Sequence, residues 1–280
     1  MKVLITGAGG ALGRDLVGAF AGHDVVAAAH DELDVADRDA VLQALGASRP
    51  DAVVHAGAWT NVDGCELDPD HAFAANAVGT RHVVEGARLV GARVCYVSTD
   101  YVFDGSANQP YVEWDPTNPV SVYGRSKLGG ERELGPQDTV VRTSWVCGRW
   151  GKNFVKTIFE RARSGQSLTV VDDQHGCPTF TDDLAEMIRR LVVERRPGLF
   201  HVTNQGATTW FALAREVAAL AGLDAEQVQP ITTAELDPPR PAPRPAYSVL
   251  DNAALRLGGV PLLADYHEPL ERLVKELLGQ

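Results

Sequence analysis

The run Lys2-Val3-Leu4-Ile5-Thr6 leads directly into Gly7-Ala8-Gly9-Gly10-Ala11-Leu12-Gly13. The first segment is short, apolar, rich in β-branched residues and bounded by glycine, which predicts a buried strand. Apolar residues then recur at helical spacing, at Leu12, Leu16, Val17 and Phe20. A strand, a glycine-rich loop and a helix in this order are typical of the turn that binds a dinucleotide pyrophosphate at the helix N-terminus. An ordinary strand-to-helix turn is the alternative.

This turn provides the first candidate cofactor-binding residues, which are Gly7, Gly10, Ala11 and Leu12. The second expected strand, 25–29, ends without the acidic residue that usually binds the adenosine ribose and selects NAD. His30 would then approach a 2′-phosphate, so NADP(H) is favoured. NAD(H) is the alternative, with Asp31 at the ribose hydroxyls.

Further cofactor-binding candidates follow the next strands. Asp34 and Val35 precede an expected helix at 37–45, where a carboxylate caps the helix or bonds the adenine amino group. Small residues after the third strand, 51–56, let a flat ring lie close to the backbone. These candidates are Ala56, Gly57 and Ala58, with Thr60 in the loop beyond and Asn76 as a buried amide on the helix expected from Asp68-Pro69 to about Leu89.

The candidate catalytic residues follow the fourth strand, 93–97, in Ser98-Thr99-Asp100-Tyr101 and in Tyr123-x-x-x-Lys127. Residues four apart share one face of a helix. A lysine ammonium beside a phenol favours the phenolate and lowers the phenol pKa, so that the tyrosine donates and accepts protons near neutral pH. The Thr99 hydroxyl would hold the same substrate oxygen from the other side. Alone, the Tyr-Lys spacing is frequently accidental.

Composition excludes several classes of protein. The net charge of −11 and pI near 5.2 argue against a nucleic-acid or anionic-membrane surface. No apolar run approaches the roughly 18 residues of a membrane span, and the N-terminus does not resemble a signal peptide. The four scattered cysteines form no metal-binding pattern and favour a reduced, cytoplasmic protein.

Alternating strand and helix patterns up to position 146 predict an α/β fold of the Rossmann type, a doubly wound parallel sheet with helices on both faces. The pattern changes after 146. We expect 1–146 to form the NAD(P)-binding domain, with 177–220 packing back on it. Segments 147–176 and 221–280 are expected to form a smaller, discontinuous C-terminal substrate lobe.

The sequence motifs together resemble those of a known family, the dTDP-4-dehydrorhamnose reductases among the extended short-chain dehydrogenase/reductases. Besides the glycine loop, the matching motifs are Ser98-Thr99-Asp100-Tyr101-Val102-Phe103-Asp104-Gly105, Val122-Tyr123-Gly124-x-Ser126-Lys127-Leu128, Arg142-Thr143-Ser144-Trp145-Val146, Asp173-Gln174-x-Gly176-x-Pro178-Thr179 and Arg244-Pro245-x-x-Ser248-x-Leu250. Their order along nearly the whole chain makes the resemblance far more specific than the glycine loop.

The resemblance implies reduction of the C4 ketone of dTDP-6-deoxy-L-lyxo-4-hexulose to dTDP-L-rhamnose with NAD(P)H. It implies that Thr99 holds the ketone oxygen, Tyr123 donates the proton and Lys127 bonds the nicotinamide ribose and tunes Tyr123. Ser98 is a further cofactor candidate. The implied substrate residues are Val62, Thr99, Asp100, Tyr101, Trp145 and Arg244, the last toward the diphosphate.

Other readings stay open. A different nucleotide-sugar reductase or epimerase fits the same scaffold, as does a non-catalytic NADP-binding regulatory subunit like the β subunit of methionine adenosyltransferase. Some family members use Mg²⁺ through glutamates. No matching cluster is found, so no metal site is predicted and a need for Mg²⁺ stays open. A nucleotide sugar is the expected partner, and a homodimer is one option.

Overall fold

Six parallel strands form the central sheet of the computed structural model, which describes residues 1–279. Their order is β10-β5-β4-β3-β1-β2, so the chain builds the sheet outward in both directions from β1 and β3. The strand bounds are β1 Lys2–Thr6, β2 Asp24–Ala28, β3 Ala52–His55, β4 Arg93–Thr99, β5 Thr139–Thr143 and β10 Gly198–His201. This order confirms the predicted doubly wound sheet, in which ligands bind at the carboxyl ends near the reversal of strand order.

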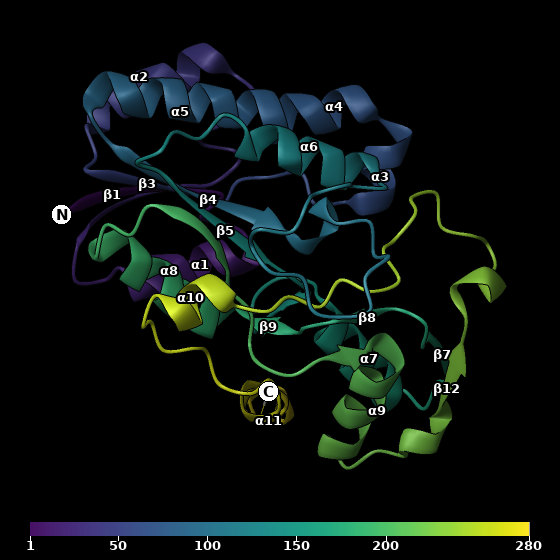
Figure 1. The fold of residues 1–280 in the computed structure, drawn as a ribbon. Helices are drawn as coiled ribbons and strands as arrows, with labels where there is room; N and C mark the ends of the chain where they lie inside the picture. Colours follow the sequence, from purple (N-terminus) through teal and green to yellow (C-terminus); the bar gives the residue numbers. More distant parts are fainter. Residues whose placement is uncertain (280) are drawn as a thin grey trace.

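Helices cover both faces of this sheet (Figure 1). Alternate residues of β1 show why, since Leu4 packs into one apolar cluster while Val3 and Ile5 pack into another on the opposite face. The first face is covered by α2 (Arg38–Ser48) and α5 (Gly79–Val90). The other is covered by α1 (Ala11–Ala19), α8 (Thr181–Val193) and α10 (Ala253–Leu257).

The segment between β3 and β4 departs from the single helix that the sequence predicts. After α3 (Val62–Leu67), the helix α4 (Pro69–Phe73) begins as expected, with the Asp68 side chain accepting the His71 N–H and Pro69 at the first position. A π-helical turn, Ala74–Val78, then separates α4 from α5. Such turns inside a helix are frequent at functional sites, and this one carries Asn76.

A second apolar cluster lies outside the central sheet and is built by α7 (Phe154–Arg163), α9 (Trp210–Leu220) and α11 (His267–Leu278) around a parallel pair, β7 (Leu168–Val171) and β12 (Val228–Ile231). The expected division differs here at two helices. Helix α9 packs in this second cluster, although 177–220 was expected to pack on the first domain, and α10 packs on the first cluster. The amphipathic pattern of a helix shows which face is buried but not which core receives it.

Two further short strand pairs lie outside the central sheet. The strand β6 (Val146–Cys147) pairs with β9 (Thr179–Phe180), and β8 (His175–Gly176) pairs with β11 (Thr208–Thr209). The remaining helix, α6 (Val122–Glu131), packs beside β4 and the π-helical turn. Because α6 carries the Tyr-Lys motif, this packing sets the position of the candidate site.

Two helix starts show how capping works in this chain. Helix α2 is capped by Asp37, whose carboxylate accepts the Ala40 N–H. Asp34 accepts the Ala36 N–H in the preceding turn, so of its two possible roles the helix cap is not the one found. Thr181 is the first residue of α8, and its buried hydroxyl has no hydrogen-bond partner among the described residues.

Candidate active site

The candidate residues converge at the carboxyl edge of the central sheet. Gly7 follows β1, Gly57 follows β3, Thr99 ends β4 and Trp145 follows β5. These four strands are adjacent, and the register pairs Thr99 with Thr143. The loops that leave adjacent parallel strands at the same edge necessarily meet, which places residues far apart in sequence around one cleft.

The glycine loop packs so closely against neighbouring backbone that only glycine fits at two of its positions. Gly7 has a φ of +69°, and a Cβ there would lie 2.8 Å from the Cα of Gly57. A Cβ on Gly13 would lie 2.1 Å from the carbonyl oxygen of Gly7. Gly10 is the N-cap of α1 and provides no side chain to its first N–H groups. This cradle and the uncapped helix end fit a dinucleotide pyrophosphate.

A buried histidine fixes the two loops against each other. The Thr6 hydroxyl contacts His55 Nδ1 at 2.7 Å and accepts the Gly57 N–H at 3.2 Å. On its other side, His55 Nε2 contacts the Thr80 hydroxyl at 3.1 Å. Burial lowers the pKa of His55 to about 3, and the charge of Lys127 adds to that lowering. The imidazole is therefore neutral and holds the cofactor floor as a structural group.

The end of β2 holds a carboxylate that sequence reasoning missed. His30 is exposed there, as is Asp34 farther on, while Val35 is buried. The Ala29 N–H donates to Glu32 Oε2 at 2.9 Å, so that the Glu32 side chain turns back to the strand end. In the sequence, the one indication of this contact is that Glu32 stands three positions after Ala29, a spacing at which a turn brings the side chain back to the end of the strand.

Asn76 joins the loop after β3 to α6. Its Oδ1 accepts the Trp59 N–H at 2.8 Å, and its Nδ2 donates to the Trp59 carbonyl and to Ser126 Oγ, each at 3.0 Å. Ser126 in turn donates to the Tyr123 carbonyl. The expected buried amide bonding backbone near the site is therefore found. Thr60, next to Trp59, is exposed.

Helix α6 presents Tyr123 and Lys127 toward β4. The Ser121 side chain caps the helix by accepting the Gly124 N–H, and a Cβ on Gly124 would lie 2.1 Å from the carbonyl oxygen of Tyr101. This close approach brings the helix onto the turn that follows Thr99. Lys127 Nζ donates to the Val97 carbonyl at 2.7 Å.

The pKa of Tyr123 differs from the sequence-based expectation. Burial raises the pKa of Tyr123, and the Thr99 hydroxyl gives the largest opposing effect. The Lys127 ammonium instead bonds the β4 backbone and lies 4.1 Å from the Tyr96 ring centroid. A phenol with a raised pKa stays protonated, which is the form a proton donor needs.

Asp100 is the most buried carboxyl of the candidate site. Its Oδ1 accepts the Thr99 hydroxyl at 3.0 Å and its Oδ2 accepts the Ser248 hydroxyl at 2.5 Å. Burial raises the pKa of Asp100 to about 6, although both hydroxyls favour the charged form. Ser248 lies in the C-terminal motif, but only the fold shows that it reaches Asp100.

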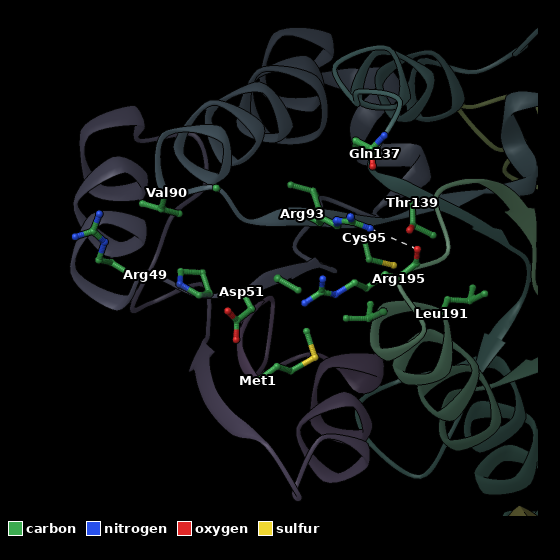
Figure 2. A pocket seen from close by; sticks show the side chains of 15 residues that line it. Met1, Arg49, Asp51, Val90, Arg93, Cys95, Gln137, Thr139, Leu191 and Arg195 are labelled. Carbon is green, nitrogen blue, oxygen red and sulfur yellow. Dashed lines mark hydrogen bonds between the residues drawn. The ribbon is translucent and has the colours of Figure 1, made fainter.

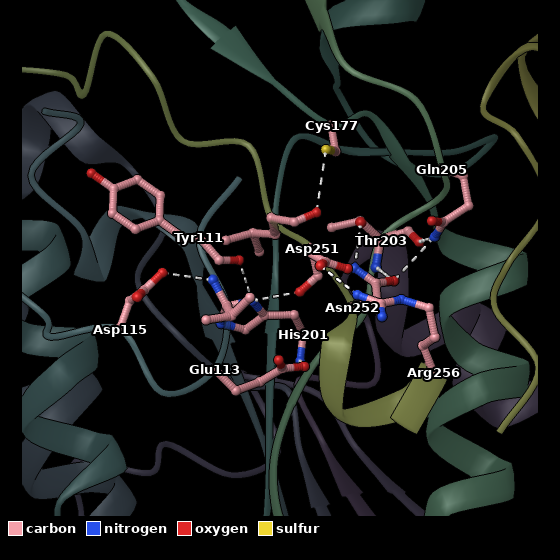
Figure 3. Close-up of polar contacts among 12 residues, drawn as sticks. Tyr111, Glu113, Asp115, Cys177, His201, Thr203, Gln205, Asp251, Asn252 and Arg256 are labelled. Carbon is pink, nitrogen blue, oxygen red and sulfur yellow. Dashed lines mark hydrogen bonds and ion pairs between the residues drawn. The ribbon is translucent and has the colours of Figure 1, made fainter. Parts of the chain in front are cut away.

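A network of backbone contacts holds the segment that carries Ser248 (Figure 3). Tyr111 N–H donates to Val249 O, and Asp251 N–H donates to Tyr111 O. His201, at the end of β10, has Nδ1 3.1 Å from the Tyr111 carbonyl and 3.1 Å from the Asp251 carbonyl. Two carbonyl partners mean that Nδ1 carries the proton. The C-terminal segment is thereby tied to the central sheet.

Two pairs of aromatic side chains include residues of the segments that follow β4 and β5. Trp145 stacks on Trp210 with ring centroids 3.5 Å apart, and Tyr101 meets the Tyr123 ring edge-on at 5.7 Å. Trp145 has a φ of +46°, a strained conformation for a non-glycine residue. A Cβ on Gly176 would lie 2.4 Å from the Trp145 ring. Trp210 was not singled out from sequence, where a helix-start tryptophan gives no signal of its own.

Arg244, the candidate for the diphosphate, is engaged by a carboxylate. Its Nη1 and Nη2 donate to the two oxygens of Asp63 at 2.9 and 2.8 Å. Asp63 also accepts the Ala242 N–H and contacts Arg240 at 3.3 Å. Burial raises the pKa of Asp63, but these bonds outweigh it and the pKa is lowered. Val62, beside Asp63, is half-buried at the start of α3.

A pocket of about 490 Å³ lies at the opposite, amino-terminal edge of the sheet (Figure 2). It is lined by Asp51, Arg49, Arg93 and Arg195 among others. The C-terminal ends of α2, α5 and α8 also line it. Helix C-termini carry partial negative charge, which arginine side chains complement. The arginine side chains at this end of the sheet are therefore explained by the helix C-termini that line the same pocket.

Within residues 1–279, no cluster of three or more His, Cys, Asp or Glu side chains is arranged to hold a metal ion. Among the same residues, no helix has the length and apolarity to cross a membrane. The four cysteines, Cys65, Cys95, Cys147 and Cys177, are free thiols and buried.

Comparison with known proteins extends this geometry. The chain matches the family described as RmlD substrate binding domain over residues 1–278. It is 44% identical to a probable dTDP-4,6-dihydroxy-2-methyloxan-3-one 4-ketoreductase of Streptomyces antibioticus, over 100% of this chain and 96% of that protein. It is 42% identical to the dTDP-4-dehydrorhamnose reductase of Streptomyces griseus, over 99% and 94% of the two chains. The crystal structure of dTDP-4-dehydrorhamnose reductase from Bacillus anthracis in complex with NADP superposes with a TM-score of 0.94 at 36% identity, covering 98% and 99% of the two chains.

Proposed function

The chain belongs to the RmlD substrate binding domain family, and from this premise we propose that it is a dTDP-4-dehydrorhamnose reductase. In this reaction the C4 ketone of dTDP-6-deoxy-L-lyxo-4-hexulose becomes the hydroxyl of dTDP-L-rhamnose. The observation that carries the proposal is the joint placement of Thr99, Tyr123 and Lys127 beside the glycine cradle. A purely binding protein has no need of a buried, protonated phenol next to a threonine hydroxyl.

The cofactor is NADP(H), which the glycine cradle and the first N–H groups of α1 would hold at the pyrophosphate. When bound, the reduced nicotinamide supplies a hydride. His30 and Glu32 lie at the end of β2, where the ribose and its 2′ substituent are recognised in this fold. Lys127 would bond the nicotinamide ribose, and Asn76 holds the adjoining loop in place.

Tyr123 donates the proton to the substrate oxygen as its charge develops, and Thr99 holds that oxygen from β4. The Thr99 hydroxyl donates to Asp100 Oδ1 at 3.0 Å, and to hold the substrate oxygen it would rotate and donate to that oxygen instead. Trp145 and Tyr101 would pack against the sugar, and Arg244 would contact the diphosphate beside Val62. The four free thiols fit a reducing, cytoplasmic setting.

An NADPH oxidation assay tests this function with the enzymatically generated 4-keto sugar nucleotide, repeated with NADH. We expect oxidation of NADPH and formation of dTDP-L-rhamnose as the product. Oxidation with a different sugar product would assign the chain to the reductases of other dTDP-linked 4-keto sugars, which the Streptomyces antibioticus relative favours. Tight cofactor binding without turnover would support the regulatory-subunit interpretation and reject the reductase.

A further inference from the structure

A largely buried ion pair lies behind the candidate catalytic residues. Arg142 donates to Glu131 from Nε at 2.9 Å and from Nη2 at 2.7 Å. The exposed fractions of the two side chains are 5% and 8%. Ser98 also donates to Glu131 Oε1, at 2.6 Å. Burying two charges costs desolvation energy that the attraction between them often only offsets, so stability alone is a poor explanation for this pair.

The position of the pair suggests what it does. Glu131 lies four residues after Lys127, one turn along the same face of α6. Ser98 directly precedes Thr99 in β4, and the register pairs Ser98 with Arg142 in β5. One carboxylate therefore connects the helix of the proton donor, the strand of the ketone-holding threonine and the strand that leads to Trp145.

The surroundings of Lys127 complete the argument. Lys127 is 2% exposed, and its ammonium faces the Tyr96 ring and the Val97 carbonyl, with neutral His55 beyond on β3. Burial lowers the pKa of Lys127 to about 7, and Glu131 is the group that opposes this lowering. Arg142, Ser98 and Tyr96 are the groups that face Glu131 from β5 and β4. Glu131 is thus the carboxylate that supports the charged form of Lys127.

We propose that Glu131 is a positioning residue of the reductase, which uses its contacts with Arg142 and Ser98 to hold α6 against β4 and β5 and to keep the Lys127 ammonium charged beside the cofactor ribose. This inference rests on the proposed function and deepens it. Glu131 contacts Arg142 and Ser98 and would act on the reaction through Lys127 and Thr99.

The variant Glu131→Gln tests the role while keeping the side-chain shape. Glu133→Gln is the matched control, because Glu133 also binds an arginine through both oxygens, Arg81, but on the surface and two residues farther along. The readout is the pH profile of kcat for NADPH oxidation, together with the pH dependence of NADPH affinity from fluorescence titration. The second readout needs no sugar substrate.

In Glu131→Gln we expect the alkaline limb of both profiles to move to lower pH by about half a unit or more, because the ammonium loses its supporting carboxylate. The loss of kcat should therefore be larger at pH 8 than at pH 6. Glu133→Gln should leave both profiles unchanged. A decrease that is equal at every pH, or unmoved limbs, would mean that Glu131 is only structural and would overturn the proposal.

Glu131→Gln leaves Arg142 buried without its partner, so this variant has a risk of misfolding. If the single variant misfolds, the double variant Glu131→Gln with Arg142→Met, which removes both charges, tests the proposal instead. The double variant should recover thermal stability yet keep the alkaline limb displaced, whereas a limb restored to the wild-type position would refute the role. If wild-type protein binds NADPH but reduces no 4-keto sugar nucleotide, the proposed function fails, and the NADPH-affinity profile still tests Glu131.

Discussion

Both ends of the central sheet carry charged side chains, but their surroundings differ. At the amino-terminal end, Arg49, Arg93 and Arg195 line a pocket of about 490 Å³ and remain partly or fully exposed. At the carboxyl end, Asp100 and Lys127 are buried, and their pKa values move to about 6 and about 7. Groups with strongly shifted pKa values gather where chemistry is performed. Burial and mutual contact therefore indicate the candidate site better than the presence of a pocket does.

The two ends also differ in how they use strained backbone. Arg195 at the amino-terminal end has a φ of +54° and Trp145 at the carboxyl end a φ of +46°. Trp145 gains a stacked partner from its conformation, Trp210, whereas Arg195 is exposed. A strained backbone conformation that positions a side chain for a contact, as at Trp145, is typical of a functional site. A strained conformation with no such contact, as at Arg195, is a position where a substitution can increase stability.

The largest effect is expected at the carboxyl end from Tyr123→Phe. Losing the phenolic proton should lower kcat by about 10²-fold or more, the usual share of a general acid, and leave NADPH affinity nearly unchanged. Steady-state oxidation of NADPH and fluorescence titration measure the two quantities. Arg93→Ala, at the other end of the sheet, should leave kcat within about twofold, because Arg93 lies away from the candidate site and its guanidinium bonds the Arg195 carbonyl. Full turnover in Tyr123→Phe would remove the basis for the catalytic assignment.

The buried Asp100 should make stability depend on pH. Its folded pKa of about 6 is above the unfolded value of roughly 3.9, so its contribution is fully present below pH 4 and is lost as pH rises through 6. Relative to Asp100→Asn, the wild-type free energy of unfolding should fall by up to about 3 kcal/mol between pH 4 and pH 8. Urea unfolding of both proteins across this range measures it. A difference that does not change with pH would show that Asp100 is ionised at all these pH values.

A smaller effect is expected from Arg244→Ala. If the guanidinium reaches the diphosphate, KM for the nucleotide sugar should rise about tenfold with little change in kcat. Arg240→Ala is the matched control, because Arg240 contacts the same Asp63 but has a side chain 58% exposed. Lower thermal stability with an unchanged KM would restrict Arg244 to fastening its loop to Asp63.

The smallest effect is a gain in stability from Arg195→Gly at the amino-terminal end. Glycine adopts a positive φ without a Cβ clash, so the variant should be more stable by about 0.5–1 kcal/mol at unchanged kcat. The same change at the other end, Trp145→Gly, also relieves the backbone but removes the stack on Trp210. We expect it to lower the melting temperature and raise KM. If Trp145→Gly were more stable and fully active, the strained conformation of Trp145 would serve no contact, just as that of Arg195 serves none, and the proposed difference between the two ends of the sheet would be wrong.

Much of the fold was predictable because its signals are local. The apolar run Lys2–Thr6 and the glycines behind it identify a strand and a turn without any other part of the chain. Likewise, Asp68-Pro69 announces a helix start through its own capping chemistry. The π-helical turn at Ala74–Val78 gave no such signal, because its sequence fits a regular helix.

The sequence predicted which residues belong to the candidate site but not their protonation states. Thr99, Asp100, Tyr123 and Lys127 were found by motif and by strand position, and the fold brings them together. Their protonation was not predictable. The pKa of Tyr123 is raised rather than lowered, because burial dominates, and Lys127 bonds the backbone of β4. Burial is a collective property of packed elements, and no spacing along one helix reports it.

By itself, the sequence determined the alternation of strands and helices, the glycine cradle and the set of candidate site residues, since periodicity and turn chemistry act over a few residues. Tertiary structure alone decided which distant groups meet. Ser248 reaches Asp100 across 148 positions and Arg244 reaches Asp63 across 181. It also decided that α9 enters the second apolar cluster and that Glu131 is buried against Arg142. Such contacts depend on how whole elements pack, because only packing sets the distances and the exclusion of water that give these charges their effect.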